Sequence, residues 1–279
     1  MSNQEWKLLS LEGVRAGFRR LKDGEYPELA GLTRAEIYDG KMGPGGLYLA
    51  ARMARTLFLK RGMTVMDLGC GRGATSVFLA RQYGVNVFAV DWWISANELY
   101  SRTREPGLSI VPMHLDVTQA LPFAEFSFDA IFCMDAIHYF GANSGFLAHL
   151  LGHLKPGGRV CIGSPCFNEE FDAATLHDLP QVYDDGTTLW NQEFSKYHSP
   201  HWWADLFQQT GLVNVLSVEE LHDGVVMWED EVLWNLERGE KSDEESLVDA
   251  RQIAYGYTHR PYLTHFVLTV ESRSRSAGQ

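Results

Sequence analysis

The sequence contains no long apolar run and few cysteines. No stretch approaches the roughly 18 apolar residues that a membrane-spanning helix needs, so we expect no stable membrane insertion. The N-terminus shows no apolar segment followed by a small-residue cleavage site, so secretion is not expected. The four cysteines, Cys70, Cys133, Cys161 and Cys166, form no CxxC pair. This spacing argues against a metal site and favours reduced thiols in a cytoplasmic protein.

Basic side chains are also scarce, because 24 Lys and Arg stand against 36 Asp and Glu, for a formal net charge of −12. Nucleic acids are bound by clustered Lys and Arg, so a nucleic-acid partner is not expected. The negative charge is concentrated in residues 165–258, which carry 4 basic and 20 acidic side chains and five of the eight tryptophans. We interpret this segment as cap insertions added to a core.

What the sequence does contain is a regular alternation of strand-like and helix-like segments. The first 60 residues favour helices, with Leu47–Leu59 the clearest. Five strands and the helices between them follow up to Gly163, and further strands are predicted over Leu212–Val218 and His265–Val270. Such alternation predicts an α/β fold, with a mostly parallel sheet covered by helices on both faces. Two stretches, 165–199 and 221–258, fall outside the repeat and are expected to be functional loops or lids, with the acidic run Asp243–Glu245 in a solvated loop.

The domain organisation follows from this reading. We expect an N-terminal helical lid over residues 1–60 and a ligand-binding core over 61–164. Residues 165–258 would complete the sheet and carry the acidic, Trp-rich cap insertions. Residues 259–279 would form the final strand and a polar tail.

The strongest motif is Asp67-Leu68-Gly69-Cys70-Gly71-Arg72-Gly73, which lies between a predicted strand and a predicted helix. The glycines permit a tight turn and close approach of a ligand to the backbone. Asp91 ends the next strand, 22 residues after Gly69, where a carboxylate can accept hydrogen bonds from two ribose hydroxyls. The dinucleotide fingerprint is G-x-G-x-x-G, whereas the spacing here is G-x-G-x-G. Asp67 would repel a pyrophosphate and suits a cationic or amino-bearing ligand.

On these residues the sequence resembles the class I S-adenosylmethionine-dependent methyltransferases, whose first motif reads acid-x-G-x-G-x-G. The Asp135-Ala136-Ile137-His138-Tyr139-Phe140 run and the Gly43–Gly46 segment are more similar to bacterial small-molecule enzymes of the cyclopropane-fatty-acid-synthase-like subgroup. The resemblance implies a Rossmann-like seven-stranded sheet and S-adenosylmethionine as cofactor. It implies a cofactor site made of Tyr38, Asp67, Gly69, Cys70, Gly71, Asp91, Trp92, Trp93, Asp116, Val117 and Met134.

Within that site, Asp91 would hold the ribose, Asp116 would lie near the adenine amino group, and Tyr38 would close over the donor. Asp135 and His138 are the titratable pair at the end of the fourth predicted strand, so we take them as candidate catalytic residues. His138 would act as a general base or orient the acceptor.

The sequence leaves three functions open. The first is methyl transfer to a small-molecule acceptor at an N, O, C or S atom. The acidic, Trp-rich segment slightly favours an amine, because aromatic rings and carboxylates attract cations. The second is a non-catalytic S-adenosylmethionine-binding module, and the third is an NAD-dependent oxidoreductase, which the glycine spacing disfavours. Homo-oligomerisation also stays open.

Overall fold

The computed structural model describes residues 9–40, 42–170, 196–221, 223–258 and 263–273. Contacts divide the chain into two compact units. Unit 1 comprises Met1–Lys22, Pro165–Trp202 and Glu220–Phe266, and unit 2 comprises Asp23–Ser164, Trp203–Glu219 and Val267–Gln279. Residues 1–60, which the sequence suggested as one lid, are therefore divided between the two units.

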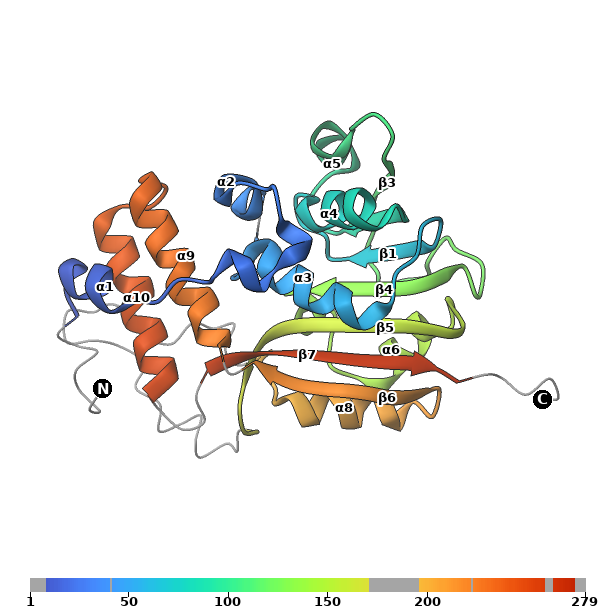
Figure 1. Cartoon of the computed structure of the whole chain (residues 1–279). Coiled ribbons are helices and arrows are strands. Elements are labelled where there is room, and N and C mark those ends of the chain that lie inside the picture. Colours follow the sequence, from blue (N-terminus) through green and yellow to red (C-terminus); the bar gives the residue numbers. More distant parts are fainter. Residues whose placement is uncertain (1–8, 41, 171–195, 222, 259–262, 274–279) are drawn as a thin grey trace. The chain divides into compact units, whose positions relative to one another are not determined.

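Most residues of a seven-stranded sheet belong to unit 2, and this sheet confirms the predicted fold class. Its order is β3-β2-β1-β4-β5-β7-β6, and the neighbours from β3 to β5 are parallel. Figure 1 shows β7 running opposite to its neighbours. The strands are β1 (Thr64–Leu68), β2 (Asn86–Asp91), β3 (Ser109–His114), β4 (Phe128–Met134), β5 (Leu154–Phe167), β6 (Val213–Leu221) and β7 (Leu263–Ser272).

Helices cover both faces of this sheet, as predicted. Figure 1 shows α3 in front of the strands and α6 and α8 behind them. Helix α3 packs closely, since a Cβ added to Gly163 of β5 would lie 2.4 Å from Sδ of Met53. The helices of unit 2 are α2 (Arg34–Tyr38), α3 (Gly46–Leu57), α4 (Ala74–Tyr83), α5 (Ala96–Thr103), α6 (Ser144–Leu151) and α8 (Pro200–Gln209), with short 3₁₀ turns η2 (Asp23–Glu25), η3 (Pro27–Leu29) and η4 (Ile137–Tyr139).

The strand order creates a crevice at one edge of the sheet. From β1 the chain continues to β2 and β3 on one side, and then returns to β4 on the other side of β1. Ligands of open α/β sheets bind at such a reversal, outside the carboxyl ends of the strands. The register pairs Leu68 with Val90 and Asp67 with Phe132. The chain therefore leaves β1, β2 and β4 at nearly the same level.

Unit 1 contains three helices among its described residues, α1 (Leu11–Gly17), α9 (Gly224–Arg238) and α10 (Asp243–Thr258). Arg19 pairs with Glu229 of α9 at 2.8 Å, and Arg20 lies 3.5 Å from the buried Asp230 of the same helix. These ion pairs attach the segment after α1 to α9.

Helices α9 and α10 occupy most of residues 221–258, so this stretch is not a loop, and its role as a lid stays a prediction. The acidic run Asp243–Glu245 forms the first turn of α10 and is not a loop. Carboxylates are favourable there because the N-terminal turn of a helix exposes unpaired N–H groups. Residues 171–195, with Trp190, lie outside the described residues, as do 259–262 and 274–279 of the predicted final segment. No helix among the described residues is both long and apolar enough to span a membrane.

Candidate functional site

The glycine turn after β1 has a left-handed backbone that favours glycine. Gly69, Gly71 and Gly73 have φ values of 70°, 54° and 88°, in the left-handed region. A Cβ on Gly69 would lie 2.3 Å from Cβ of Ala136, and one on Gly71 would lie 2.9 Å from Sδ of Met42. The backbone therefore approaches its neighbours so closely that a methyl group would collide with them.

Asp67 supports the turn from beneath and does not line the cavity described below. The side chain is buried, and its Oδ2 accepts hydrogen bonds from Thr75 Oγ1 and Ser76 Oγ, both at 2.6 Å. Burial raises the pKa of Asp67 to about 6, although the Ser76 and Thr75 hydroxyls partly oppose the shift. The carboxyl thus joins the end of β1 to the first turn of α4.

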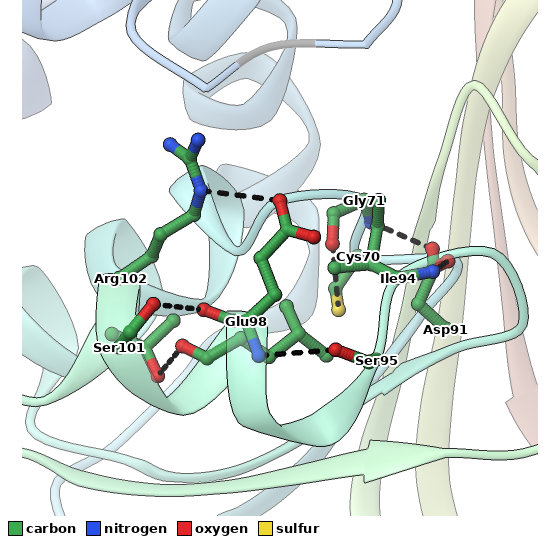
Figure 2. Close-up of polar contacts among 10 residues, drawn as sticks. Cys70, Gly71, Asp91, Ile94, Ser95, Glu98, Ser101 and Arg102 are labelled. Atoms are coloured by element: carbon green, nitrogen blue, oxygen red, sulfur yellow. Dashed lines mark hydrogen bonds and ion pairs between the residues drawn. The ribbon is translucent and has the colours of Figure 1, made fainter.

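Asp91 links the end of β2 to the same turn (Figure 2). Its Oδ2 accepts the backbone N–H of Gly71 at 2.8 Å. Its Oδ1 accepts the N–H groups of Trp93 and Ile94 at 2.7 and 2.9 Å. Three backbone donors therefore fix the carboxylate beside the turn.

A cavity of about 270 Å³ opens at this edge of unit 2. Its walls come from the carboxyl ends of β1, β2 and β4 and from the segment around the start of α3. The lining residues are Ile37, Gly40, Met42, Gly43, Gly46, Leu47, Gly69, Cys70, Gly71, Ala74, Thr75, Asp91, Trp92, Trp93, Met134, Asp135, Ala136, Tyr139 and Phe140. The cavity brings together eight residues predicted from the sequence: Gly69, Cys70, Gly71, Asp91, Trp92, Trp93, Met134 and Asp135.

Asp135 follows β4 in an unusual backbone conformation. Its φ of 52° is left-handed for a residue with a side chain, and its N–H donates to Gly163 O at 2.8 Å. Gly43 packs directly against it, because a Cβ on Gly43 would lie 2.2 Å from Oδ2 of Asp135. The position of this carboxylate therefore depends on the absence of a side chain at residue 43.

His138 is buried next to the cavity but does not line it. Its Nδ1 lies 3.1 Å from Oγ of Ser164, and its ring is 4.2 Å from that of Tyr139, which does line the cavity. The structure thus separates the predicted pair, with Asp135 on the wall and His138 behind Tyr139.

Four further candidates of the cofactor site lie off the cavity: Tyr38, Asp67, Asp116 and Val117. The Tyr38 ring is buried, with its centroid 6.1 Å from that of Tyr48, and it is not among the residues that line the cavity. Asp116 accepts hydrogen bonds from the backbone N–H and hydroxyl of Thr118, which lower its pKa. Val117 is buried.

Sequence reasoning missed the contribution of the segment before α3. Ile37, Gly40, Met42, Gly43, Gly46 and Leu47 all line the cavity, as do Ala74, Thr75 and Phe140. The glycine cluster Gly43–Gly46 was a usable signal, since such a cluster permits the backbone to approach another chain segment closely. Across the described ranges, no group of three or more His, Cys, Asp or Glu side chains could hold a metal ion.

Comparison with known families identifies the core of unit 2. The family model for a methyltransferase domain matches residues 65–158, which include the glycine turn, Asp91 and Asp135. Residues 65–158 are therefore similar to a methyltransferase domain, and the cofactor of such domains is S-adenosylmethionine.

Known relatives of the methyltransferase domain are distant. The chain is 28% identical to phosphoethanolamine N-methyltransferase 1 of Arabidopsis thaliana over 177 residues, 62% of this chain and 35% of the relative. It spans only between 33% and 40% of the length of the five such enzymes that it matches.

Solved structures support the fold alone. Haemonchus contortus phosphoethanolamine N-methyltransferase 2, solved with phosphomonomethylethanolamine and S-adenosylhomocysteine, has a TM-score of 0.69 at 16% identity, over 96% of this chain and 61% of that one. A Galdieria sulphuraria protein provisionally assigned as a sarcosine dimethylglycine methyltransferase has a TM-score of 0.65 at 20% identity, over 81% and 84%.

The cavity of the methyltransferase domain fits S-adenosylmethionine. The glycine turn leaves free the space that a Cβ would fill, and the Asp91 carboxylate stands beside it at the end of β2. Among the described lining residues there is no Lys or Arg, whereas two carboxylates are present. Such a wall suits a nucleoside that carries a sulfonium and an amino group better than a pyrophosphate.

Proposed function

We propose that this protein is an S-adenosylmethionine-dependent methyltransferase that methylates a small-molecule acceptor, with an amine favoured. The observation that carries the proposal is a single cavity that joins the glycine turn, Asp91 and Asp135. An amine agrees with the carboxylates of the cavity wall and with the names of the phosphoethanolamine relatives. The two alternatives, an NAD-dependent oxidoreductase and a module that binds the cofactor without catalysis, have less support. The glycine spacing disfavours NAD, and a module that only binds the cofactor needs no second carboxylate in the cavity.

In this proposal the residues around β1 and β2 hold the donor. When bound, S-adenosylmethionine supplies a sulfonium methyl group whose bond to sulfur breaks with its electron pair left on the sulfur. Gly69 and Gly71 admit the nucleoside to the backbone, and the Asp91 carboxylate accepts hydrogen bonds from ribose hydroxyls. Trp92 offers an apolar wall for the base, and Met134 packs near the reacting end. Asp67 keeps the turn in place from below.

The residues after β4 bind and deprotonate the acceptor. An ammonium acceptor must lose a proton before its nitrogen lone pair can form the bond to the methyl carbon. We assign this proton to the Asp135 carboxylate, which lines the cavity, and from there it passes to water. Transfer is an in-line displacement, so alignment and exclusion of water supply much of the rate. His138, behind Tyr139, acts as a positioning residue.

A binding experiment tests the donor site. Calorimetry is expected to show binding of S-adenosylhomocysteine and none of NAD. Asp91→Asn is expected to weaken the interaction roughly 10- to 100-fold, since hydrogen bonds to a charged group contribute about 1.5–3 kcal/mol. Asp205→Asn, on the exposed surface of α8, is the matched control and should bind normally. Absence of S-adenosylhomocysteine binding to the wild-type protein would overturn the proposal.

A turnover experiment separates an enzyme from a binding module. Labelled methyl groups are followed from S-adenosylmethionine into a panel of small amines, alcohols and thiols. Transfer to at least one acceptor class is expected, and binding without any transfer to metabolite extracts would favour the module. We further propose a cytoplasmic location, in keeping with four cysteines that are buried and free.

A further inference from the structure

The cavity of the methyltransferase domain has two ends, and the proposed donor accounts for only one. Strands β2 and β4 flank β1, and neighbouring strands lie about 4.8 Å apart, so their ends are separated by roughly 10 Å. Asp91 stands at the β2 end together with the glycine turn. Asp135 stands at the β4 end with Tyr139 and Phe140. With Asp91 assigned to the donor, the Asp135 end of the cavity is left for the acceptor.

The Asp135 carboxylate is held in a fixed position. A left-handed backbone is unfavourable for a residue with a side chain and persists only where its surroundings impose it. Here the surroundings are the hydrogen bond from Asp135 N–H to Gly163 O and the direct packing of Gly43. The fold therefore presents the Asp135 carboxyl group at a defined place in the cavity.

Aromatic rings line the same cavity as Asp135. The rings of Trp93 and Tyr139 pack edge to face, with centroids 4.9 Å apart and an interplanar angle of 71°. Trp93 is 59% exposed although it lines the cavity, and Met42 at the rim is 51% exposed. Large apolar side chains with this exposure are covered favourably by a ligand. The electron-rich face of an indole attracts a cation.

We propose that Asp135, Trp93 and Tyr139 form a subsite for an organic cation, and that the acceptor is an amine without a phosphate group. This inference rests on the proposed function and specifies its substrate class. It also assigns Trp93 to acceptor binding, whereas the sequence analysis placed this residue in the cofactor site. A phosphate in the cavity would face two carboxylates and no described Lys, Arg or His among the lining residues. Like charges at short range in a partly dry site repel strongly.

Three probes test the subsite, and the first two have nearly the same shape. The protein is saturated with S-adenosylhomocysteine and titrated with choline, with its neutral isostere 3,3-dimethylbutan-1-ol, and with phosphocholine. Choline carries a quaternary nitrogen and cannot accept a methyl group, so binding is measured without turnover. We expect choline to bind at least tenfold more tightly than either of the other two. Equal binding of choline and the neutral isostere would overturn the cation subsite, and equal or tighter binding of phosphocholine would overturn the exclusion of phosphate.

Substitutions test which residues are responsible for the binding of choline. Asp135→Asn and Trp93→Leu are each expected to weaken choline binding at least fivefold and to leave the affinity for S-adenosylhomocysteine within twofold. Trp93 is largely exposed, so its variant should fold even if Asp135→Asn does not. The matched controls are Asp205→Asn and Tyr100→Leu, an exposed carboxylate and a 56% exposed ring outside the cavity, and they should bind choline as the wild type does.

The outcomes separate the two proposals. If S-adenosylhomocysteine does not bind, the proposed function fails and the subsite with it. If it binds but choline shows no preference, only the subsite is wrong. If Asp135→Asn weakens S-adenosylhomocysteine instead of choline, this carboxylate serves the amino group of the cofactor, and the inference is overturned.

Discussion

Replacing Gly69 by alanine tests the packing of the cavity floor. The residue has a φ of 70°, and a Cβ there would lie 2.3 Å from Cβ of Ala136 and 3.3 Å from Cζ of Phe140. A left-handed alanine costs about 1–2 kcal/mol. Overpacking of a buried contact adds about 1–3 kcal/mol. Gly69→Ala should therefore lower the free energy of unfolding by about 2–5 kcal/mol and abolish S-adenosylhomocysteine binding.

A substitution at a second glycine separates the cost of the left-handed backbone from the cost of overpacking. Gly107 has a φ of 88°, and a Cβ there would meet nothing within 4 Å. Gly107→Ala should carry only the backbone cost, about 1–2 kcal/mol. The double variant Gly69→Ala, Ala136→Gly removes the nearest colliding methyl group and should recover part of the loss. The resulting coupling free energy is expected to be about 1–3 kcal/mol.

Urea unfolding of the wild type, Gly69→Ala, Ala136→Gly, the double variant and Gly107→Ala measures these quantities, and calorimetry follows binding. Equal destabilisation by Gly69→Ala and Gly107→Ala would refute the reasoning, because the contact with Ala136 would then cost nothing. A coupling free energy near zero would refute it independently.

Three further predictions concern titration and positioning. The folded state raises the pKa of Asp67 to about 6 from 3.8, so the stability that this group contributes is complete below pH 3.8 and is lost as pH rises through 6. Ser76→Ala removes a hydroxyl that opposes the shift, so the loss should extend to higher pH, with about 1–3 kcal/mol less stability at pH 8 in urea unfolding; an unchanged pH profile would contradict this. Burial lowers the pKa of His265 to about 3 from 6.5, so the folded state binds fewer protons between these values and stability falls as pH drops below 6.5, by about 2 kcal/mol at pH 5. His265→Gln should flatten that part of the profile, and an equal slope in both proteins would show that another group is responsible. Gly43→Ala should displace the Asp135 carboxylate and reduce kcat with an amine acceptor roughly 10²-fold while binding of S-adenosylhomocysteine is unchanged; equal loss of both would place Gly43 in the donor site.

The sequence by itself determined the frame of the cavity. The apolar run before Gly69 and the helical pattern after Gly73 predicted a strand, a turn and a helix, and the structure has β1 and α4 at these places. Such elements depend on local periodicity and on the conformational freedom of glycine, and both are written in a short stretch of sequence. Because parallel strands end at one edge of the sheet, the places of Asp91 and Asp135 followed as well.

The sequence also contained a signal that was misread. Asp243, Glu244 and Glu245 were taken as a solvated loop, yet a cluster of acids is equally typical of the first turn of a helix. Local composition did not separate these two readings. The distinction required the packed helix that follows.

Tertiary structure alone decided which side chains reach the cavity. Tyr38 points into the core and its neighbour Ile37 lines the wall, while His138 lies behind Tyr139. The contact between Gly43 and Asp135 joins positions 92 residues apart in the sequence. Local preference cannot fix such features, because the rotation of a short helix and the path of a loop are set by the packing of distant segments against each other.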